Sequence, residues 1–338
     1  MIKERAWPAR AMYLLIAAAL AISLLIVAAP SQKAVAQDGD VAAEWEMVDT
    51  PTMDGWVLAP ESMIIDYHTA AEGEVAYAVV EAYDETCGEG WDDFEPRLLK
   101  SDDYCATWDD LTEALEDLID VDDGDYIDYI ARVATDWEDP DFVVVALWWW
   151  DSSAGNYYLH VFFSTDGGDT FEDAGEVEDG GVYLDMVADL VVTPETGGDR
   201  DIFIGGTANS TYGAGLFHCV VTGDSAGAWH DATDYDDYEG WDNMDPADAP
   251  TTGDIFSWMV TDLIVSPNWA LDKTVLTTTI ADDYANGYHG VYLQCGSFGS
   301  SPAWNEFSTL GIEAVEIKTN NSHDILLPTA LAGWDAGQ

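Results

Sequence analysis

The sequence predicts an all-β fold, a β-propeller of four-stranded antiparallel blades with about four full blades and a partial fifth. One observation is an octet that begins with a small residue, ends with a large aromatic residue and occurs at Ser101–Trp108, Ser164–Phe171, Thr222–Trp229 and Ser297–Trp304. Another is an apolar strand pattern that precedes these octets by 35, 33, 33 and 35 residues and is centred on Asp66, Ala131, Asp189 and Asp262. Chance does not hold four spacings so closely, so the chain is a repeat protein.

The segments between these landmarks predict the strands of each blade. In the second unit, runs of β-branched and aromatic residues predict strands at Tyr129–Ala134, Phe142–Trp148 and Tyr157–Phe163, and Phe171 opens a fourth strand after the octet. The third and fourth units repeat this order, with strands expected at Met186–Val192, Ile202–Gly206, Leu216–Val221, Met259–Val265, Val275–Thr279 and Gly290–Leu293.

The octets predict tight turns between third and fourth strands. The second octet fits the pattern S-x-D-x-G-x-T-[FW] throughout, the first departs from it at Cys105, and the last two keep only part of it. An Asp side chain accepts backbone N–H groups within such a turn, and the terminal aromatic residue packs between sheets. The residues expected to hold these turns are Ser101, Asp103, Thr107, Trp108, Ser164, Asp166, Gly168, Thr170, Phe171, Asp224, Trp229 and Trp304.

With these octets, residues 45–338 resemble the Asp-box (BNR-repeat) β-propellers, a family that includes sialidases and secreted bacterial surface proteins. The resemblance implies a propeller and little about activity, because this fold carries enzymes, receptors and scaffolds.

The first 36 residues predict an export signal, followed by the propeller over residues 37–338. Lys3, Arg5 and Arg10 precede an apolar run over residues 11–29, and Ala34-Val35-Ala36 supplies a small-x-small cleavage site. The alternative is an uncleaved N-terminal membrane anchor, since this run is long for a signal peptide. Either way the propeller is expected outside the cell, secreted or at the cell surface.

The chain is strongly acidic, with 10 Lys+Arg against 66 Asp+Glu and a formal net charge of −56. Such a surface repels phosphate backbones, which excludes nucleic acid as a partner. A cell-envelope component, a glycan or a protein partner remains, and contact with a membrane is expected only through residues 11–29 if they are not cleaved. The acidity itself fits solubility, high salt or cation binding.

Both ends of the propeller carry strand patterns. Trp45–Val48 resembles the stretch that follows an octet, and is expected to supply an outer strand that closes the ring. Residues 314–319 and 325–331 predict the start of a fifth unit, and the sequence stops at Gln338 without its octet. We therefore expect a propeller that is incomplete at its C-terminus; a five-unit ring with one imperfect blade is the alternative.

Clustered carboxylates predict Ca²⁺, which takes six to eight oxygen ligands. No other cofactor is expected. Two acidic loops are candidates, with ligands Asp120, Asp122, Asp123, Asp125, Asp234, Asp236, Asp237 and Glu239; solvated loops without metal are the alternative. A disulfide between Cys87 and Cys105 is expected within one repeat. The alternative is that the cysteines serve as small buried hydrophobic residues.

The residues indicate no catalytic site. Sialidases clamp a carboxylate with three arginines, and after the signal this chain has only Arg97, Arg132 and Arg200, without the family's Arg-x-Pro order. Trp148-Trp149-Trp150 with Tyr157 and Tyr158 offers either a platform for sugars or packing between blades. The expected function is therefore a cell-surface or extracellular scaffold or interaction module, and the alternative is a secreted carbohydrate-active enzyme, a sialidase-like glycoside hydrolase.

Overall fold

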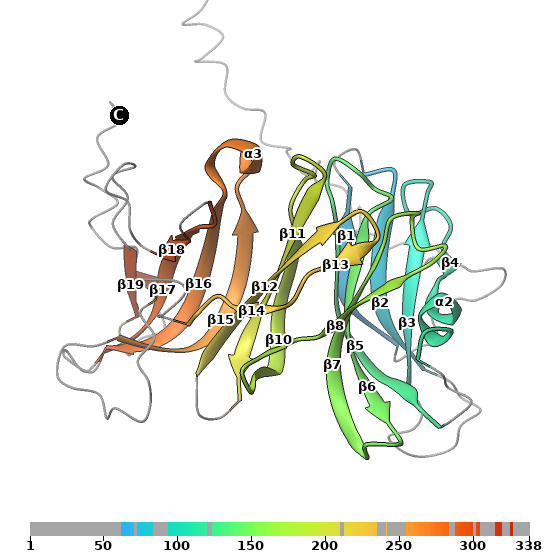
Figure 1. Ribbon diagram of the computed structural model, residues 1–338, viewed down its shortest axis with the longest axis horizontal. Helices are drawn as coiled ribbons and strands as arrows, with labels where there is room; N and C mark the ends of the chain where they lie inside the picture. The colour runs from blue at the N-terminus through green and yellow to red at the C-terminus, as the bar shows by residue number, and fades with distance from the viewer. Residues whose placement is uncertain are drawn as a thin grey trace, which may run out of the picture. The chain divides into compact units, whose positions relative to one another are not determined.

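The computed structural model describes residues 62–70, 73–83, 94–119, 124–209, 213–234, 241, 255–283, 288–299, 302–304, 315–319 and 325–326. All of them belong to one compact unit, Asp49–Gln338. The described residues form four antiparallel sheets that follow one another in chain order (Figure 1). No helix in this part of the chain is long and apolar enough to span a membrane.

The first two sheets have four strands each, in the sequential order expected of a propeller blade. The strands are β1 (Met63–Thr69), β2 (Ala76–Tyr83), β3 (Phe94–Ser101), β4 (Asp109–Asp110), then β5 (Tyr126–Thr135), β6 (Val143–Asp151), β7 (Asn156–Ser164) and β8 (Glu172–Glu176). Every strand expected for the second unit is present within a few residues, so the prediction of four-stranded antiparallel blades is confirmed here.

The third and fourth sheets keep this order for their first three strands and add short ones. The strands are β9 (Glu178–Asp179), β10 (Val182–Val192), β11 (Asp199–Ala208), β12 (Ala214–Thr222), β13 (Ser225–Ala226), β14 (His230–Asp231), then β15 (Ile255–Val265), β16 (Thr274–Asp283), β17 (Tyr288–Ser297), β18 (Ala303–Trp304), β19 (Val315–Thr319) and β20 (Ile325–Leu326).

The expected start of a fifth unit belongs to the fourth sheet instead. β19 pairs antiparallel with β17, from Gly290 opposite Lys318 to Leu293 opposite Val315, and β20 pairs with β19. The sequence interpretation was wrong at this point because a strand pattern shows an alternating face and not the edge on which the strand pairs.

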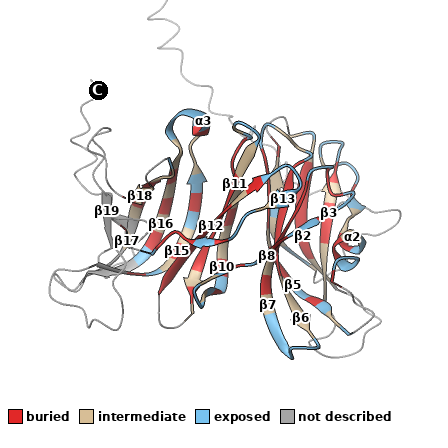
Figure 2. Ribbon diagram, viewed as in Figure 1, coloured by how far each residue is buried: buried red, intermediate tan, exposed pale blue. Residues whose placement is uncertain are grey.

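Most of the core lies between successive sheets, and one small cluster around Trp108 lies on the first sheet alone (Figure 2). One cluster joins the first and second sheets, a second joins the second and third, and a third joins the third and fourth. The short helix α2 (Thr112–Glu116) places Leu115 in the first of these clusters, and α3 (Trp269–Asp272) contributes Trp269 to the third. Side chains therefore fix each sheet against its neighbours.

Candidate functional site

The first long strands of the four sheets, β1, β5, β10 and β15, contact one another in chain order and are called the inner strands here. Each pairs with the following strand through a β-bulge. The last bulge of each inner strand comes directly before Asp66, Arg132, Asp189 and Asp262. Bulges often re-aim side chains beside functional sites, so these four residues mark one structural position repeated in four sheets.

Hydrogen bonds at this position tie neighbouring inner strands together. The Asp66 carboxylate accepts the Val133 N–H at 2.9 Å, and the Asp189 carboxylate accepts the Leu263 N–H at 2.6 Å. In the second sheet, Arg132 Nε donates to the Ala188 carbonyl at 2.7 Å. Each side chain thus reaches the residue beside the same position of the next sheet.

Asp189 and Asp262 lie beside each other on neighbouring inner strands, since the Asp189 carboxylate accepts the N–H of Leu263, the residue after Asp262. Asp189 is partly buried, whereas Asp262 is exposed. Burial raises the pKa of Asp189 to about 7; the Leu263 and Leu190 N–H groups lower it, and the side chain and charge of Asp262 raise it. Asp189 can therefore hold a proton near neutral pH beside Asp262, which solvent reaches. Such a pair of carboxyl groups can carry out acid–base catalysis.

Two glycines allow this approach. Gly205 pairs with Asp189, and a Cβ on it would stand 2.6 Å from Cγ1 of Val260 on β15. A Cβ on Gly206 would stand 1.8 Å from the Met186 carbonyl oxygen, within the bulged stretch of β10. Only residues without a side chain let β10 bulge and β15 pack this closely, so Gly205 and Gly206 help to bring the two carboxyl groups together.

Arg132 occupies the same position on β5, beside Tyr129. Burial, together with the charges of Glu81 and Asp66, raises the pKa of Tyr129 against the lowering effect of Arg132. A phenol with a raised pKa is a weaker nucleophile at neutral pH, so Tyr129 is suited to positioning Arg132 or a ligand rather than to attack.

The three arginines considered for a sialidase clamp are not equivalent. Arg97 pairs with Glu95 and Asp110 within the first sheet. Arg200 pairs with Asp136, Asp139 and Glu195, and its guanidinium lies 4.4 Å from the centre of the Phe142 ring. Only Arg132 lies on an inner strand, and the described structure gives no sign of a triad.

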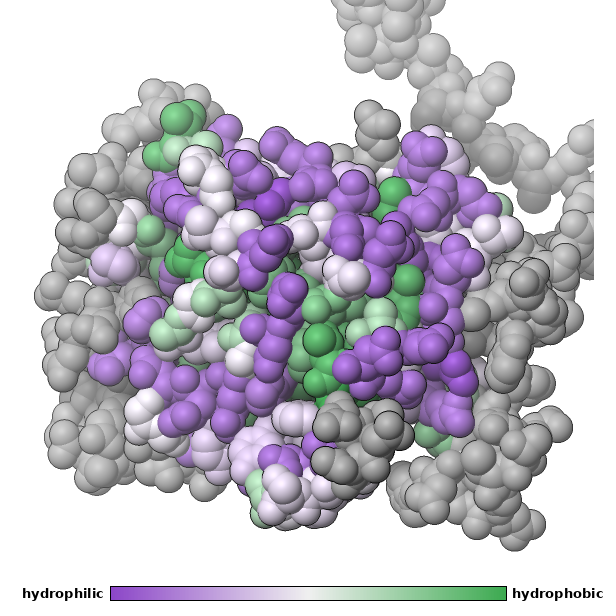
Figure 3. Space-filling view, turned by 45° about the vertical axis from the view of Figure 1, so that its right-hand side comes forward, coloured by the Kyte–Doolittle hydropathy of each residue, from purple (hydrophilic) through white to green (hydrophobic). Residues whose placement is uncertain are grey.

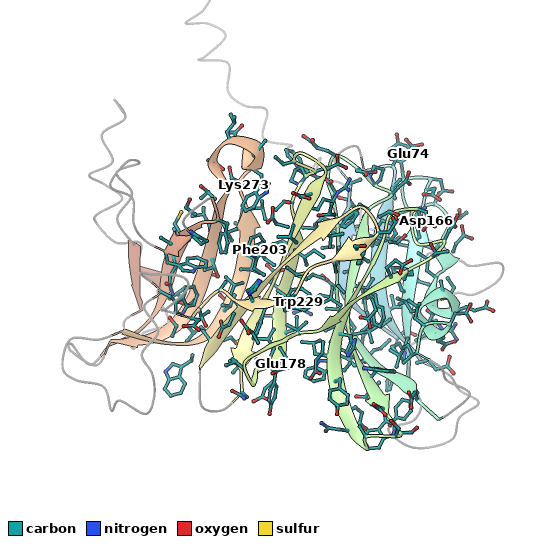
Figure 4. All side chains as sticks on the ribbon, viewed as in Figure 1. Glu74, Asp166, Glu178, Phe203, Trp229 and Lys273 are labelled. Atoms are coloured by element: carbon teal, nitrogen blue, oxygen red, sulfur yellow. The ribbon has the colours of Figure 1, made fainter. Side chains whose placement is uncertain are left out.

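The first two octets form turns with one shared hydrogen-bond network. In the second, Asp166 accepts from the Ser164 hydroxyl at 2.7 Å, the Thr170 N–H at 2.9 Å and the Thr170 hydroxyl at 2.7 Å. Gly168 donates its N–H to Ser164 Oγ. The first octet repeats these bonds through Ser101, Asp103, Cys105 and Thr107, with Cys105 at the glycine position and φ of 66°. Figure 4 labels Asp166.

The last two octets contribute through their terminal aromatic residue. Among the described residues, Asp224 accepts no hydrogen bond from its own turn. It accepts one from the Thr165 hydroxyl, at 3.4 Å. Trp229, labelled in Figure 4, donates its indole N–H to the Ala174 carbonyl of the previous sheet. Trp304 donates equivalently to Ala232. Trp108, Phe171, Trp229 and Trp304 are all buried, as expected of residues that pack between sheets.

Most of the expected metal ligands lie outside the described residues, namely Asp120, Asp122, Asp123, Asp236, Asp237 and Glu239. Of the rest, Asp125 accepts the Ser152 N–H at 2.8 Å, and Asp234 ends the described part of its loop. Cys87 and the strand expected at Trp45–Val48 also lie outside it, whereas Cys105 is described, with its Sγ 3.2 Å from the Tyr67 hydroxyl. The calcium loops and the Cys87–Cys105 disulfide therefore stay predictions.

The carboxyl pair was missed as a site from the sequence. Asp189 and Asp262 were used only as landmarks of a strand, although a charged residue inside an apolar pattern that recurs in several repeats is a signal for function. The repeat alignment also placed Ala131 where the structure places Arg132, because the bulge shifts the register by one residue.

No family model matches the sequence, and no curated protein matches it. Solved structures do match. An α-L-arabinofuranosidase of Fusarium graminearum is 13% identical, with 79% of this chain and 69% of that chain covered and a TM-score of 0.39. A Hadza microbial sialidase is 13% identical, with 71% of this chain and 43% of that chain covered and a TM-score of 0.39. The native arabinanase of Bacillus subtilis is 12% identical, with 70% of this chain and 72% of that chain covered and a TM-score of 0.28.

These likenesses concern the fold. Most of the matched structures are glycoside hydrolases, so the expectation of a non-catalytic scaffold is withdrawn; the matches themselves assign no activity to this chain.

Proposed function

We propose that this chain is a glycoside hydrolase in which Asp189 is the general acid and Asp262 the second carboxylate. The observation that carries the proposal is the contact of the Asp189 carboxylate with the N–H of the residue after Asp262, which sets two carboxyl groups of neighbouring inner strands beside each other. Glycoside hydrolysis uses two such groups, one protonated and one ionised, on either side of the bond that is cleaved.

Each group has an environment suited to its part. Asp189 is partly buried, which favours its neutral, proton-donating form, while Asp262 is exposed. Asp189 donates its proton to the glycosidic oxygen as the bond from that oxygen to the anomeric carbon breaks. The Asp262 carboxylate adds to the anomeric carbon, and water then releases the sugar while Asp189 takes the proton from the water.

The two strands also carry apolar side chains. The exposed Met186 and Trp258, on the same two strands, offer apolar surface to the sugar ring. Figure 3 shows apolar surface gathered on one face of the molecule within a largely hydrophilic border.

A neutral sugar suits this site better than sialic acid. Arg97 and Arg200 are each occupied by carboxylates, so only Arg132 stands at the bulge position of an inner strand. Without a clamp of several cations, the acidic surface repels an anionic sugar.

The test is hydrolysis of aryl glycosides by the full chain. The panel holds neutral furanosides and pyranosides together with an aryl sialoside, and compares the native chain with Asp189→Asn. Asp185→Asn is the matched control, since Asp185 is an exposed carboxylate on the same strand. We expect turnover of a neutral glycoside that Asp189→Asn lowers by about 10²-fold or more and Asp185→Asn leaves unchanged. Turnover of the sialoside alone, or of no glycoside, contradicts the proposal.

We also propose that the chain is exported and that its four octets are degenerate Asp-box repeats. The export signal over residues 1–36 and the networks around Asp103 and Asp166 support this. Calcium binding by the two acidic loops belongs to the same proposal; if EDTA leaves the melting temperature unchanged, the calcium part fails.

A further inference from the structure

The second sheet carries a row of three aromatic residues across three of its strands. Tyr126 on β5 pairs with Trp150 on β6, and Trp150 pairs with Tyr157 on β7. The Tyr126 and Trp150 rings lie 6.5 Å apart at 27°, and the Trp150 and Tyr157 rings 4.8 Å apart at 59°. The two tyrosine hydroxyls are 3.2 Å apart. The rings therefore hold one another in place before any ligand arrives.

This aromatic row is the solvent-exposed end of a face whose other end is core. Trp148, two residues before Trp150, packs against the cluster between the second and third sheets. Tyr126 and Tyr157 remain 43% and 41% exposed. Packing between sheets therefore accounts for Trp148 but leaves the row itself uncovered by the residues that the structure describes.

The charges around the aromatic row select the occupant. Asp125 and Asp151 adjoin Tyr126 and Trp150 in the chain, Asp128 follows on β5, and residues 133–199 contain no Lys or Arg. Carboxylates accept hydrogen bonds from hydroxyl groups, while aromatic faces receive the C–H face of a sugar ring. The same carboxylates repel uronic, sialic, sulfated and phosphorylated ligands.

We propose that the Tyr126–Trp150–Tyr157 row is a binding site for a neutral polysaccharide. The row spans three strands, so it suits a chain of sugars rather than a single residue. This inference rests on the proposed glycoside hydrolase function only for the reason why the protein would hold a polysaccharide. Binding at the row itself needs no catalysis.

The experiment is affinity electrophoresis of the full chain in gels that contain neutral polysaccharides (arabinan, galactan, glucan or mannan) or the anionic polygalacturonate. Binding is measured in the Asp189→Asn background, so that hydrolysis does not remove the ligand. Trp150→Ala and Tyr157→Ala are the test variants. Trp137→Ala is the matched control, since Trp137 is 38% exposed in the loop after β5. Thermal unfolding checks that each variant is folded.

We expect at least one neutral polysaccharide to retard the protein, and Trp150→Ala and Tyr157→Ala each to weaken this association by about tenfold while Trp137→Ala leaves it unchanged. Equal binding by all variants, stronger retardation by polygalacturonate, or no retardation by any neutral polymer overturns the inference. If binding is found as expected but the native chain hydrolyses no glycoside, the proposed activity fails and the binding site stands.

Discussion

Asp189 on β10 accepts the N–H of Leu263 on β15 at 2.6 Å, and Leu263 is the residue after Asp262. This bond sets the Asp189 carboxyl group where the charge of Asp262 raises its pKa. The acid–base account of this molecule depends on this arrangement.

Asp262→Asn is expected to lower the pH at which the Asp189 carboxyl group loses its proton. Asp262 raises the pKa of Asp189 through its side chain and its charge, and the amide of asparagine removes the charge. Titration of the Asp189 carboxyl group, followed by NMR from pH 3 to 9 in the variant and in the native chain, checks this. A midpoint that stays in place contradicts it.

Asp189→Asn is expected to stabilise the fold at alkaline pH. The folded protein raises the pKa of Asp189 from 3.8 to about 7, so the native state holds a proton that the unfolded chain has already released between those values. Stability is therefore lost as the pH rises through this window, and the uncharged variant escapes the loss. We expect a gain of about 2 kcal/mol at pH 8 and little at pH 4. Denaturant unfolding at both pH values measures it; an equal effect at both would show that the charge of Asp189 is not the cause.

Gly206→Ala is expected to damage both stability and activity. Its Cβ would stand 1.8 Å from the Met186 carbonyl oxygen, so β10 must move close to Asp189. Overpacking of this kind costs about 1–3 kcal/mol. Gly299→Ala is the control, because a Cβ there meets no atom within 4 Å. Melting temperature and turnover are the readouts. Full activity of Gly206→Ala would show that the close approach at Gly206 is not needed for the site.

Asp166→Ala is expected to destabilise the protein by about 1–2 kcal/mol at pH 7, whereas Asp224→Ala in the third octet should cost little. Asp166 accepts three hydrogen bonds inside its turn, and Asp224 accepts none there that the structure describes. The bonds from Ser164 and Thr170 outweigh burial and lower the pKa of Asp166. Its contribution is therefore present above the ordinary aspartate pKa and is lost as the pH falls through the lower folded value. Chemical unfolding at pH 7 and pH 3 tests both statements; equal losses in the two variants would contradict them.

Local features of the fold could be predicted from the sequence. The run Phe142–Trp148 is β-branched and aromatic, and the structure makes it β6, while Ser164–Phe171 carries its own turn chemistry. Hydrophobic alternation and turn residues act over a few positions, so they can be read without knowing the neighbours.

The site could not be predicted in this way. Asp189 and Asp262 lie far apart in the chain and meet only because the bulges and Gly205 bring two inner strands together. Because of the bulge in β5, the residue of the second sheet that is equivalent to Asp189 is Arg132 and not Ala131, which the repeat spacing had indicated. The strand at Val315–Thr319 was assigned to the wrong sheet because its pairing partner on β17 is set by the assembled edge and not by its own residues.

Comparing two leaving groups tests the central claim most directly. The rates of the native chain and Asp189→Asn are measured on aryl glycosides of one sugar, one with a poorly acidic phenol and one with 2,4-dinitrophenol, which leaves without help from an acid. If Asp189 is the general acid, the variant loses about 10²- to 10⁴-fold in kcat/KM on the first substrate and little in kcat/KM on the second, since kcat/KM reports the step in which the phenol leaves. Equal losses on both substrates, or none on either, would contradict the assignment of Asp189 as the acid.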